Sequence, residues 1–107
     1  MSVTIDRVLA ALNTGDLDAF LSCYEADATI EAGHDTILAR GHAEIRDRYH
    51  QMFETYPALR VKALGRWVVG PYVVQEEEVT GRARGTERHI AIYRLTTGAI
   101  AREWLLR

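Results

Sequence analysis

The sequence predicts an α+β domain in which helices come first and a mostly antiparallel sheet follows. Two observations carry this prediction. Hydrophobic residues recur at helical spacing in the first half of the chain, and from Leu59 onward they alternate with period two. A third observation is size, since 107 residues of which 48% are hydrophobic can bury one core. We therefore expect residues 1–107 to form a single domain with its helices packed on one sheet face.

Three hydrophobic stripes at helical spacing predict three helices. The members of the stripes are Ile5, Val8, Leu9 and Leu12; Leu17, Phe20, Leu21 and Tyr24; and Ile45, Tyr49, Met52, Phe53 and Tyr56. Gly15 is expected to end the first helix, and Asp16 to cap the second, which ends near Glu25. The third helix is expected to begin after Gly41 and to stop before Pro57.

Five strands are expected, separated by turn residues. Their predicted ranges are 28–32, 59–69, 72–83, 87–95 and 99–106. Residues 96–98 (Thr-Thr-Gly) resemble a three-residue hairpin loop. That loop would place Tyr93 opposite Ala101 and Ala91 opposite Glu103, and a turn about Gly85 would place Glu77 opposite Tyr93.

Composition and charge exclude several classes of function. The formal net charge is −2 with no charged block, so nucleic acid is not expected as a partner. The one cysteine, Cys23, cannot form an intrachain disulfide, and no residue spacing indicates a metal site. No stretch approaches the roughly 20 apolar residues of a membrane span. We expect a cytoplasmic protein with no cofactor and no membrane partner.

Four segments resemble the nuclear-transport-factor-2-like superfamily, nearest to its ketosteroid-isomerase and SnoaL-like branch. They are residues 10–18 (AALNTGDLD), 27–31 (DATIE), 41–49 (GHAEIRDRY) and 98–104 (GAIAREW). The resemblance implies a cone in which three N-terminal helices cover a strongly curved, mostly antiparallel sheet and enclose a deep apolar pocket. Proteins of this fold include isomerases, cyclases, dehydratases, hydrolases and plain binding modules, so the resemblance does not imply one activity.

The resemblance can be carried over position by position. Val8 matches the oxyanion-hole tyrosine of ketosteroid isomerases, Ala32 their proton-shuttling aspartate, and Ala91 their protonated aspartate donor. The two supporting pocket tyrosines are kept as Tyr24 and Tyr49. Isomerisation by the usual residues is therefore disfavoured, whereas the pocket itself is expected.

Strand alternation predicts which other residues face the pocket. The residues expected on the concave face with Ala91 are Val73, Gln75, Glu77, Tyr93 and Glu103. Burial of two nearby carboxyl groups raises their pKa values, which suits acid–base chemistry near neutral pH. The alternative is that each pairs with an arginine at the rim, such as Arg60 or Arg107.

The histidines are less informative. His34 is expected near the pocket opening beside Asp35, either as a base with its orienting carboxylate or as a solvated loop pair. His89 shares the parity of Ala91, and the nearby Gly85 turn predicts a place at the rim.

Two classes of function remain open. The first is a cofactor-independent enzyme that isomerises, dehydrates or hydrolyses a small hydrophobic molecule bearing a carbonyl or hydroxyl group. Glu77 or Glu103 would move the proton, and Tyr24 and Tyr49 would orient the oxygen. The alternative is a non-catalytic ligand-binding or dimerisation module. An epoxide-hydrolase-like reaction ranks third, because it would need an Asp-Arg-Asp triad that the expected inward positions lack.

A homodimer is expected through the convex sheet face. The residues that would meet a partner there are Ile90, Ile92, Arg102 and Trp104. Together they would form an apolar patch too large to leave exposed.

Overall fold

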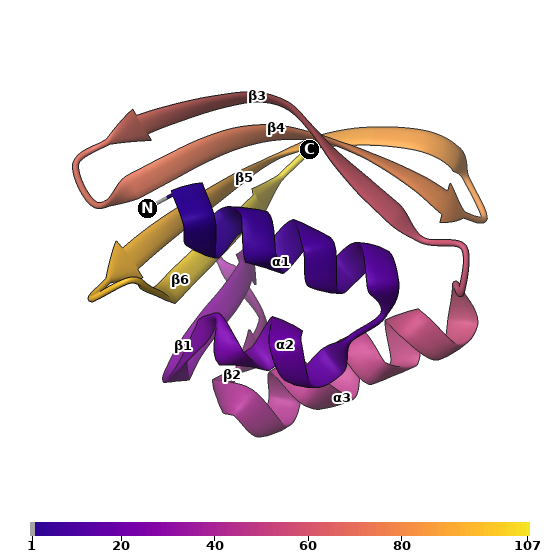
Figure 1. The fold of residues 1–107 in the computed structure, drawn as a ribbon, viewed down its shortest axis with the longest axis horizontal. Helices are drawn as coiled ribbons and strands as arrows, with labels where there is room; N and C mark the ends of the chain where they lie inside the picture. Colours follow the sequence, from indigo (N-terminus) through magenta and orange to yellow (C-terminus); the bar gives the residue numbers. More distant parts are fainter. Residues whose placement is uncertain (1) are drawn as a thin grey trace.

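The computed structural model describes residues 2–107 and has three helices on one side of a six-stranded, curved sheet (Figure 1). The helices are α1 (Ser2–Thr14), α2 (Leu17–Ser22) and α3 (Gly41–Thr55). The strands are β1 (Tyr24–Ala32), β2 (Thr36–Arg40), β3 (Arg60–Val69), β4 (Tyr72–Arg82), β5 (Gly85–Thr96) and β6 (Ala99–Leu106). The predicted α+β fold class is confirmed. No helix within this described range is long and apolar enough to cross a membrane.

The sheet has the strand order β2-β1-β6-β5-β4-β3, and every neighbouring pair is antiparallel except β1 with β6. The ladder register shifts in each of the five pairs, for example between Arg94 and Leu95 of β5. Extra residues of this kind bend a strand and increase its twist. The sheet consequently arches over α1 (Figure 1).

The three helical stripes bury their apolar residues between the helices and the sheet. Ile5 and Val8 of α1, Phe20 of α2 and Ile45 of α3 are almost completely buried, and they share one core cluster with Tyr93 of β5. A smaller cluster of Leu59, Val61 and Val79 packs under the far ends of α1 and α3. Burial of these stripes is the main force that holds the helices on the sheet.

The second helix ends earlier than expected, and Tyr24 begins a strand. The Cys23 amide closes α2 by donating to the Phe20 carbonyl oxygen at 3.1 Å, and the Cys23 carbonyl oxygen accepts from the Ile100 amide at 2.8 Å. Tyr24 therefore continues alongside β6 instead of adding a turn to the helix. The sequence pattern also does not predict β2, which pairs with the outer edge of β1.

The predicted registers are wrong, although the predicted faces are right. Tyr93 pairs with Glu103 instead of Ala101, and Ala91 pairs with Leu105 instead of Glu103. The hairpin turn between Thr96 and Ala99 is one residue shorter than expected, and the adjacent bulge adds a second residue to the offset. Glu77 pairs with His89 instead of Tyr93. Each final offset is even, so no side chain changes face.

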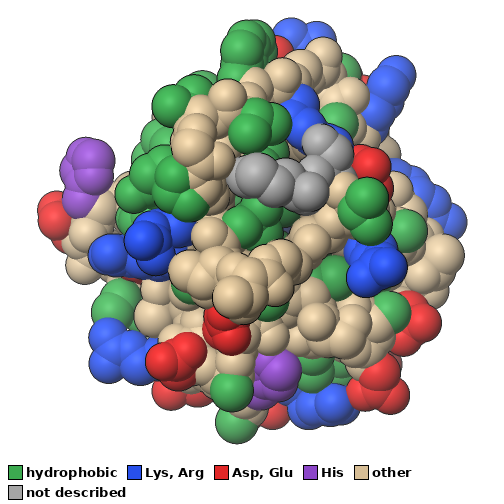
Figure 2. All heavy atoms as spheres, turned by 60° about the vertical axis from the view of Figure 1, so that its left-hand side comes forward, with side chains coloured by type: hydrophobic (Ala, Val, Ile, Leu, Met, Phe, Trp, Pro, Cys, Tyr) green, Lys and Arg blue, Asp and Glu red, His purple; other side chains and the backbone are tan. Residues whose placement is uncertain are grey.

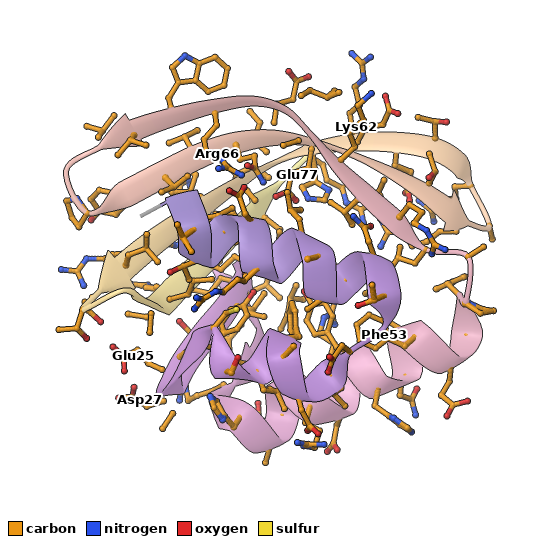
Figure 3. All side chains as sticks on the ribbon, viewed as in Figure 1. Glu25, Asp27, Phe53, Lys62, Arg66 and Glu77 are labelled. Carbon is orange, nitrogen blue, oxygen red and sulfur yellow. The ribbon has the colours of Figure 1, made fainter. Side chains whose placement is uncertain are left out.

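Burial along the strands shows the alternation directly. In β4, Val73, Gln75, Glu77 and Val79 are buried and their neighbours are more exposed. Glu77 points from the sheet toward the helices, whereas Lys62 points away from them (Figure 3). The concave face therefore carries the buried polar groups.

The convex face is partly apolar and partly charged. Ile90 is exposed, and the Arg102 guanidinium lies 4.9 Å from the centre of the Trp104 ring while pairing with Glu31 at 2.6 Å. Hydrophobic side chains gather at the upper left of the face shown in Figure 2. The exposed large hydrophobic residues on β3, β4 and β5 are Trp67, Val68, Val69, Tyr72 and Ile90. The homodimer stays a prediction.

The end of β4 packs closely against the backbone of Ala58 at Gly81. Its φ is +85°, and a Cβ atom there would lie 2.1 Å from the carbonyl oxygen of Ala58. Gly81→Ala should lower the free energy of unfolding by about 3 kcal/mol or more, because a backbone clash adds to left-handed strain. Gly70→Ala, at φ +57° with open space around it, should cost about 1 kcal/mol. Equal losses in urea denaturation would contradict the close approach.

Candidate functional site

A cavity of about 540 Å³ lies between the helices and the concave face of the sheet. This volume falls within the roughly 300–1,000 Å³ of small-molecule sites. Its wall is mainly apolar, with contributions from Leu12, Phe20 and Met52. The polar and charged residues that line it are Tyr24, Arg48, Tyr49, Glu77, Arg82, His89, Tyr93, Glu103 and Arg107.

Glu103 extends from β6 into this cavity and is 3% exposed. The Tyr24 hydroxyl group donates a hydrogen bond to its Oε1 atom, and within residues 2–107 it is the one donor to this carboxyl group. The pKa of Glu103 is raised to about 8. Burial is the largest cause and the charge of Glu77 acts in the same direction, while the Tyr24 hydrogen bond and the Arg48 charge partly offset them. Glu103 can therefore exchange a proton near neutral pH.

Glu77 is buried to the same extent but is surrounded by donors. The Tyr93 hydroxyl and the Gln75 Nε2 atom each donate to its Oε2 atom at 2.7 Å. The His89 Nε2 atom lies 2.8 Å from its Oε1 atom. Three such contacts satisfy a buried carboxylate and hold its orientation.

A chain of contacts orients Gln75 from the outside. The Arg66 Nε atom donates to the Gln75 Oε1 atom at 2.7 Å, which leaves the Gln75 amide nitrogen directed at Glu77. Arg66 also pairs with Asp6 of α1 at 2.9 Å. Arg66 and Glu77 both lie beneath the arch of the sheet, on the side of the helices (Figure 3).

Three tyrosines surround the two carboxyl groups. Phe20 lies between two of them, with ring centroids 5.0 Å from Tyr24 and 4.4 Å from Tyr49. Burial, followed by the charge of Glu103, raises the pKa values of Tyr24, Tyr49 and Tyr93, so all three hydroxyl groups stay protonated. Tyr24 and Tyr93 donate to glutamates, whereas the Tyr49 hydroxyl group has no hydrogen-bond partner in the described chain.

Most of the predicted site residues meet at the cavity. Those that line it are Val8, Tyr24, Ala32, Tyr49, Glu77, Tyr93 and Glu103. Val73, Gln75 and Ala91 lie on the same face but are buried behind its surface. The alternative of rim ion pairs is not observed, since no described arginine pairs with Glu77 or Glu103.

His34 does not itself line the cavity, although Ala32 and Gly33 directly before it do. His34 follows β1 and lies in a separate groove with Tyr72, Ile92 and Trp104 on the convex side of the sheet. The turn that connects β1 to β2 therefore places Gly33 at the cavity and His34 at the separate groove.

Two basic residues of the cavity were not predicted there from the sequence. His89 was expected at the rim, but the register of β4 with β5 places it directly opposite Glu77. Arg48 of α3 also lines the cavity, and its spacing from Ile45 and Met52 places it next to the buried stripe of this helix.

The sequence profile of the SnoaL-like domain matches residues 5–103, and the chain belongs to this family. No curated protein matches the chain in sequence. This family assignment confirms the resemblance stated from the sequence.

Solved structures with the same fold have diverse assignments. An uncharacterised cystatin-fold protein of Novosphingobium aromaticivorans has a TM-score of 0.92 at 21% identity over 98% of this chain and 96% of its own. A Sinorhizobium meliloti protein assigned as a polyketide cyclase has a TM-score of 0.86 at 19% identity, covering 98% and 94%. An epoxide hydrolase of Mycobacterium tuberculosis has a TM-score of 0.80 at 15% identity, covering 97% and 79%. At these identities the likeness extends to the fold alone.

The raised pKa of Glu103 predicts a pH-dependent effect on stability. Between pH 4.5 and about 8 the folded protein keeps a proton that the unfolded chain releases. The contribution of Glu103 to the free energy of unfolding is therefore largest at low pH and falls by up to about 1.4 kcal/mol per pH unit across this window. Glu103→Gln should become more stable relative to the wild type as pH rises from 5 to 8. Parallel stability curves in urea denaturation would contradict the buried, protonated carboxyl group.

The hydrogen bond from Tyr24 can be tested through the pKa of Glu103. Because this bond lowers the pKa of Glu103, Tyr24→Phe should raise that pKa above its value of about 8. Tyr72→Phe, on the convex face, serves as the matched control and should leave it unchanged. The readout is a carbon NMR titration of the glutamate carboxyl groups, and an unchanged or lower pKa in Tyr24→Phe would be inconsistent with the contact.

Proposed function

We propose that this protein binds a small hydrophobic molecule bearing a carbonyl or hydroxyl group and catalyses a cofactor-independent acid–base reaction on it. The reaction class is isomerisation, dehydration or hydrolysis. One observation carries the proposal, namely a buried carboxyl group, Glu103, that lines an apolar cavity and whose pKa is raised to about 8. General acid–base catalysis is most efficient when the pKa of the catalytic group lies near the working pH.

The contacts favour different roles for the two carboxyl groups. Glu77 has three hydrogen-bonding neighbours, so it serves as a fixed charge that shapes the cavity. Glu103 has Tyr24 as its one donor in the described chain. The other oxygen atom of its carboxyl group can therefore form a hydrogen bond with a ligand. Glu103 is accordingly the proton shuttle, and Tyr24 positions it.

Tyr49 is the donor for the substrate oxygen. Its hydroxyl group stays protonated, lines the cavity and is not engaged by another described residue. In an isomerisation, ionised Glu103 takes a proton from the carbon next to the substrate carbonyl, and Tyr49 stabilises the enolate oxygen that forms. Glu103 then returns the proton to another carbon of the conjugated system, so that the enzyme ends in its starting state.

The comparisons support the fold and favour none of the reactions. The assignments of the neighbouring structures include a polyketide cyclase and an epoxide hydrolase, which carry out different chemistry. A non-catalytic ligand-binding module stays the alternative, and it predicts binding without turnover.

A ligand screen followed by turnover assays tests the proposal. Planar phenols, enones, steroids and terpenoid alcohols are screened by thermal shift, since a ligand at 100 times its Kd stabilises the fold by about 2.7 kcal/mol. Compounds that bind are then assayed for conversion. Glu103→Gln should lose about 10²–10⁴-fold in turnover and keep binding, because glutamine can still accept from Tyr24 but cannot carry the proton.

Glu54→Gln is the matched control, since Glu54 is exposed on α3 and its one ion-pair partner among residues 2–107 is His50. It should leave turnover unchanged. Conversion that survives in Glu103→Gln would overturn the assignment of the proton shuttle, and binding without any conversion by the wild type would favour the binding module.

A further inference from the structure

Arg48 is a cation of the cavity that the proposed chemistry does not use. It precedes Tyr49 on α3, and its side chain lines the cavity with Tyr49 and Glu103. Its Nε atom is buried without a hydrogen-bond partner, and its guanidinium group makes no ion pair with any residue in 2–107. A buried donor in this state costs about 1–3 kcal/mol, and more when it is charged.

The other basic residues of the cavity wall either contact a carboxylate or are exposed. Arg82 pairs with Glu87 at 2.8 Å, and His89 lies 2.8 Å from Glu77. Arg107 is exposed at the end of the chain. Arg48 is therefore the cavity cation that is partly buried and has no acceptor in the described chain.

No neighbouring side chain of the described protein serves as the anionic partner of Arg48. Its positive charge lowers the pKa values of Glu103 and Tyr49, so both groups lie within electrostatic reach, yet neither accepts a hydrogen bond from it. Glu103 is mostly protonated at neutral pH and Glu77 is already occupied by three donors. A ligand can therefore supply the anion without meeting an ionised Glu103.

We propose that Arg48 binds a carboxylate group of the ligand, so that the substrates of this cavity are small hydrophobic carboxylic acids. Guanidinium and carboxylate groups match in a planar, bidentate geometry, which orients a ligand as well as holding it. The carboxylate lies at Arg48 and the reacting carbonyl or hydroxyl group lies between Tyr49 and Glu103. This substrate class rests on the proposed function, which places the reaction in the same cavity.

Matched acid and amide pairs test the carboxylate site. Binding of 2-naphthoate and 2-naphthamide, and of cinnamate and cinnamamide, is measured by calorimetry on the wild-type chain. The carboxylates should bind about 10-fold or more tightly than their amides, as expected for a charge-assisted contact. Arg48→Met should remove this preference, and Arg48→Lys should keep only part of it. Arg46→Met is the control, because Arg46 pairs with Asp18 outside the cavity, and it should bind as the wild type does.

Stability supplies a readout that needs no ligand. Methionine keeps the apolar stem of the side chain and removes the orphaned donor, so Arg48→Met should melt at the same or a higher temperature than the wild type. A fall of many degrees would overturn the inference by showing that Arg48 supports the fold. Equal binding of acid and amide, a preference that survives in Arg48→Met, or no binding of either pair would overturn it as well.

The outcome is separable from that of the proposed function. Glu103→Gln should keep the preference for carboxylates, because the anion is bound at Arg48. If that preference holds and no compound is converted, the acid–base reaction fails while the carboxylate site stands. If a neutral ketone is converted in a Glu103-dependent way without any carboxylate preference, only the role of Arg48 is overturned.

Discussion

The cost of burying two carboxyl groups in an apolar cavity is the constraint on which the site depends. The protein meets this constraint in two ways. Glu77 receives donors from Gln75, Tyr93 and His89, which satisfy its charge. Glu103 receives one donor from the described chain, and its pKa is raised to about 8, chiefly by burial, so it is mostly protonated at pH 7 and can release its proton near neutral pH. The contrast between a satisfied carboxylate and an under-satisfied one separates a structural group from a group that can move a proton.

The fold could be predicted from the sequence at the level of elements and faces. Period-two alternation identified the last four strands, and helical stripes identified three helices. The registers could not be predicted, because bulges such as the one between Arg94 and Leu95 leave no mark in the hydrophobic pattern. Tyr24 was misplaced for a related reason. It continues the stripe of α2 in sequence, whereas a long-range hydrogen bond from Ile100 to Cys23 draws the chain into the sheet.

The site was partly predictable because errors of an even number of residues preserve the face of a strand. Glu77 and Glu103 therefore lie on the expected concave face although their predicted partners were wrong. His89 required the true register, which the Gly85 turn alone does not specify. Which groove His34 lines depends on the path of the turn after β1, and the hydrophobic pattern does not specify that path. Arg48 could have been found from its spacing to Ile45 and Met52.

The parallel pairing of β1 with β6 has a consequence for how the protein is made. Tyr24 and Glu103 stand 79 positions apart in the chain, and among the described strands β1 pairs with β2 and β6. During synthesis α1, α2, β1 and β2 leave the ribosome long before β6 exists. Until then, the edge of β1 that pairs with β6 stays unpaired. The β1–β2 hairpin is only marginally stable in this state, because it has two strands. The cavity therefore closes only after β6 has been synthesised, and the hydrogen bond from Tyr24 to Glu103 cannot form before that point.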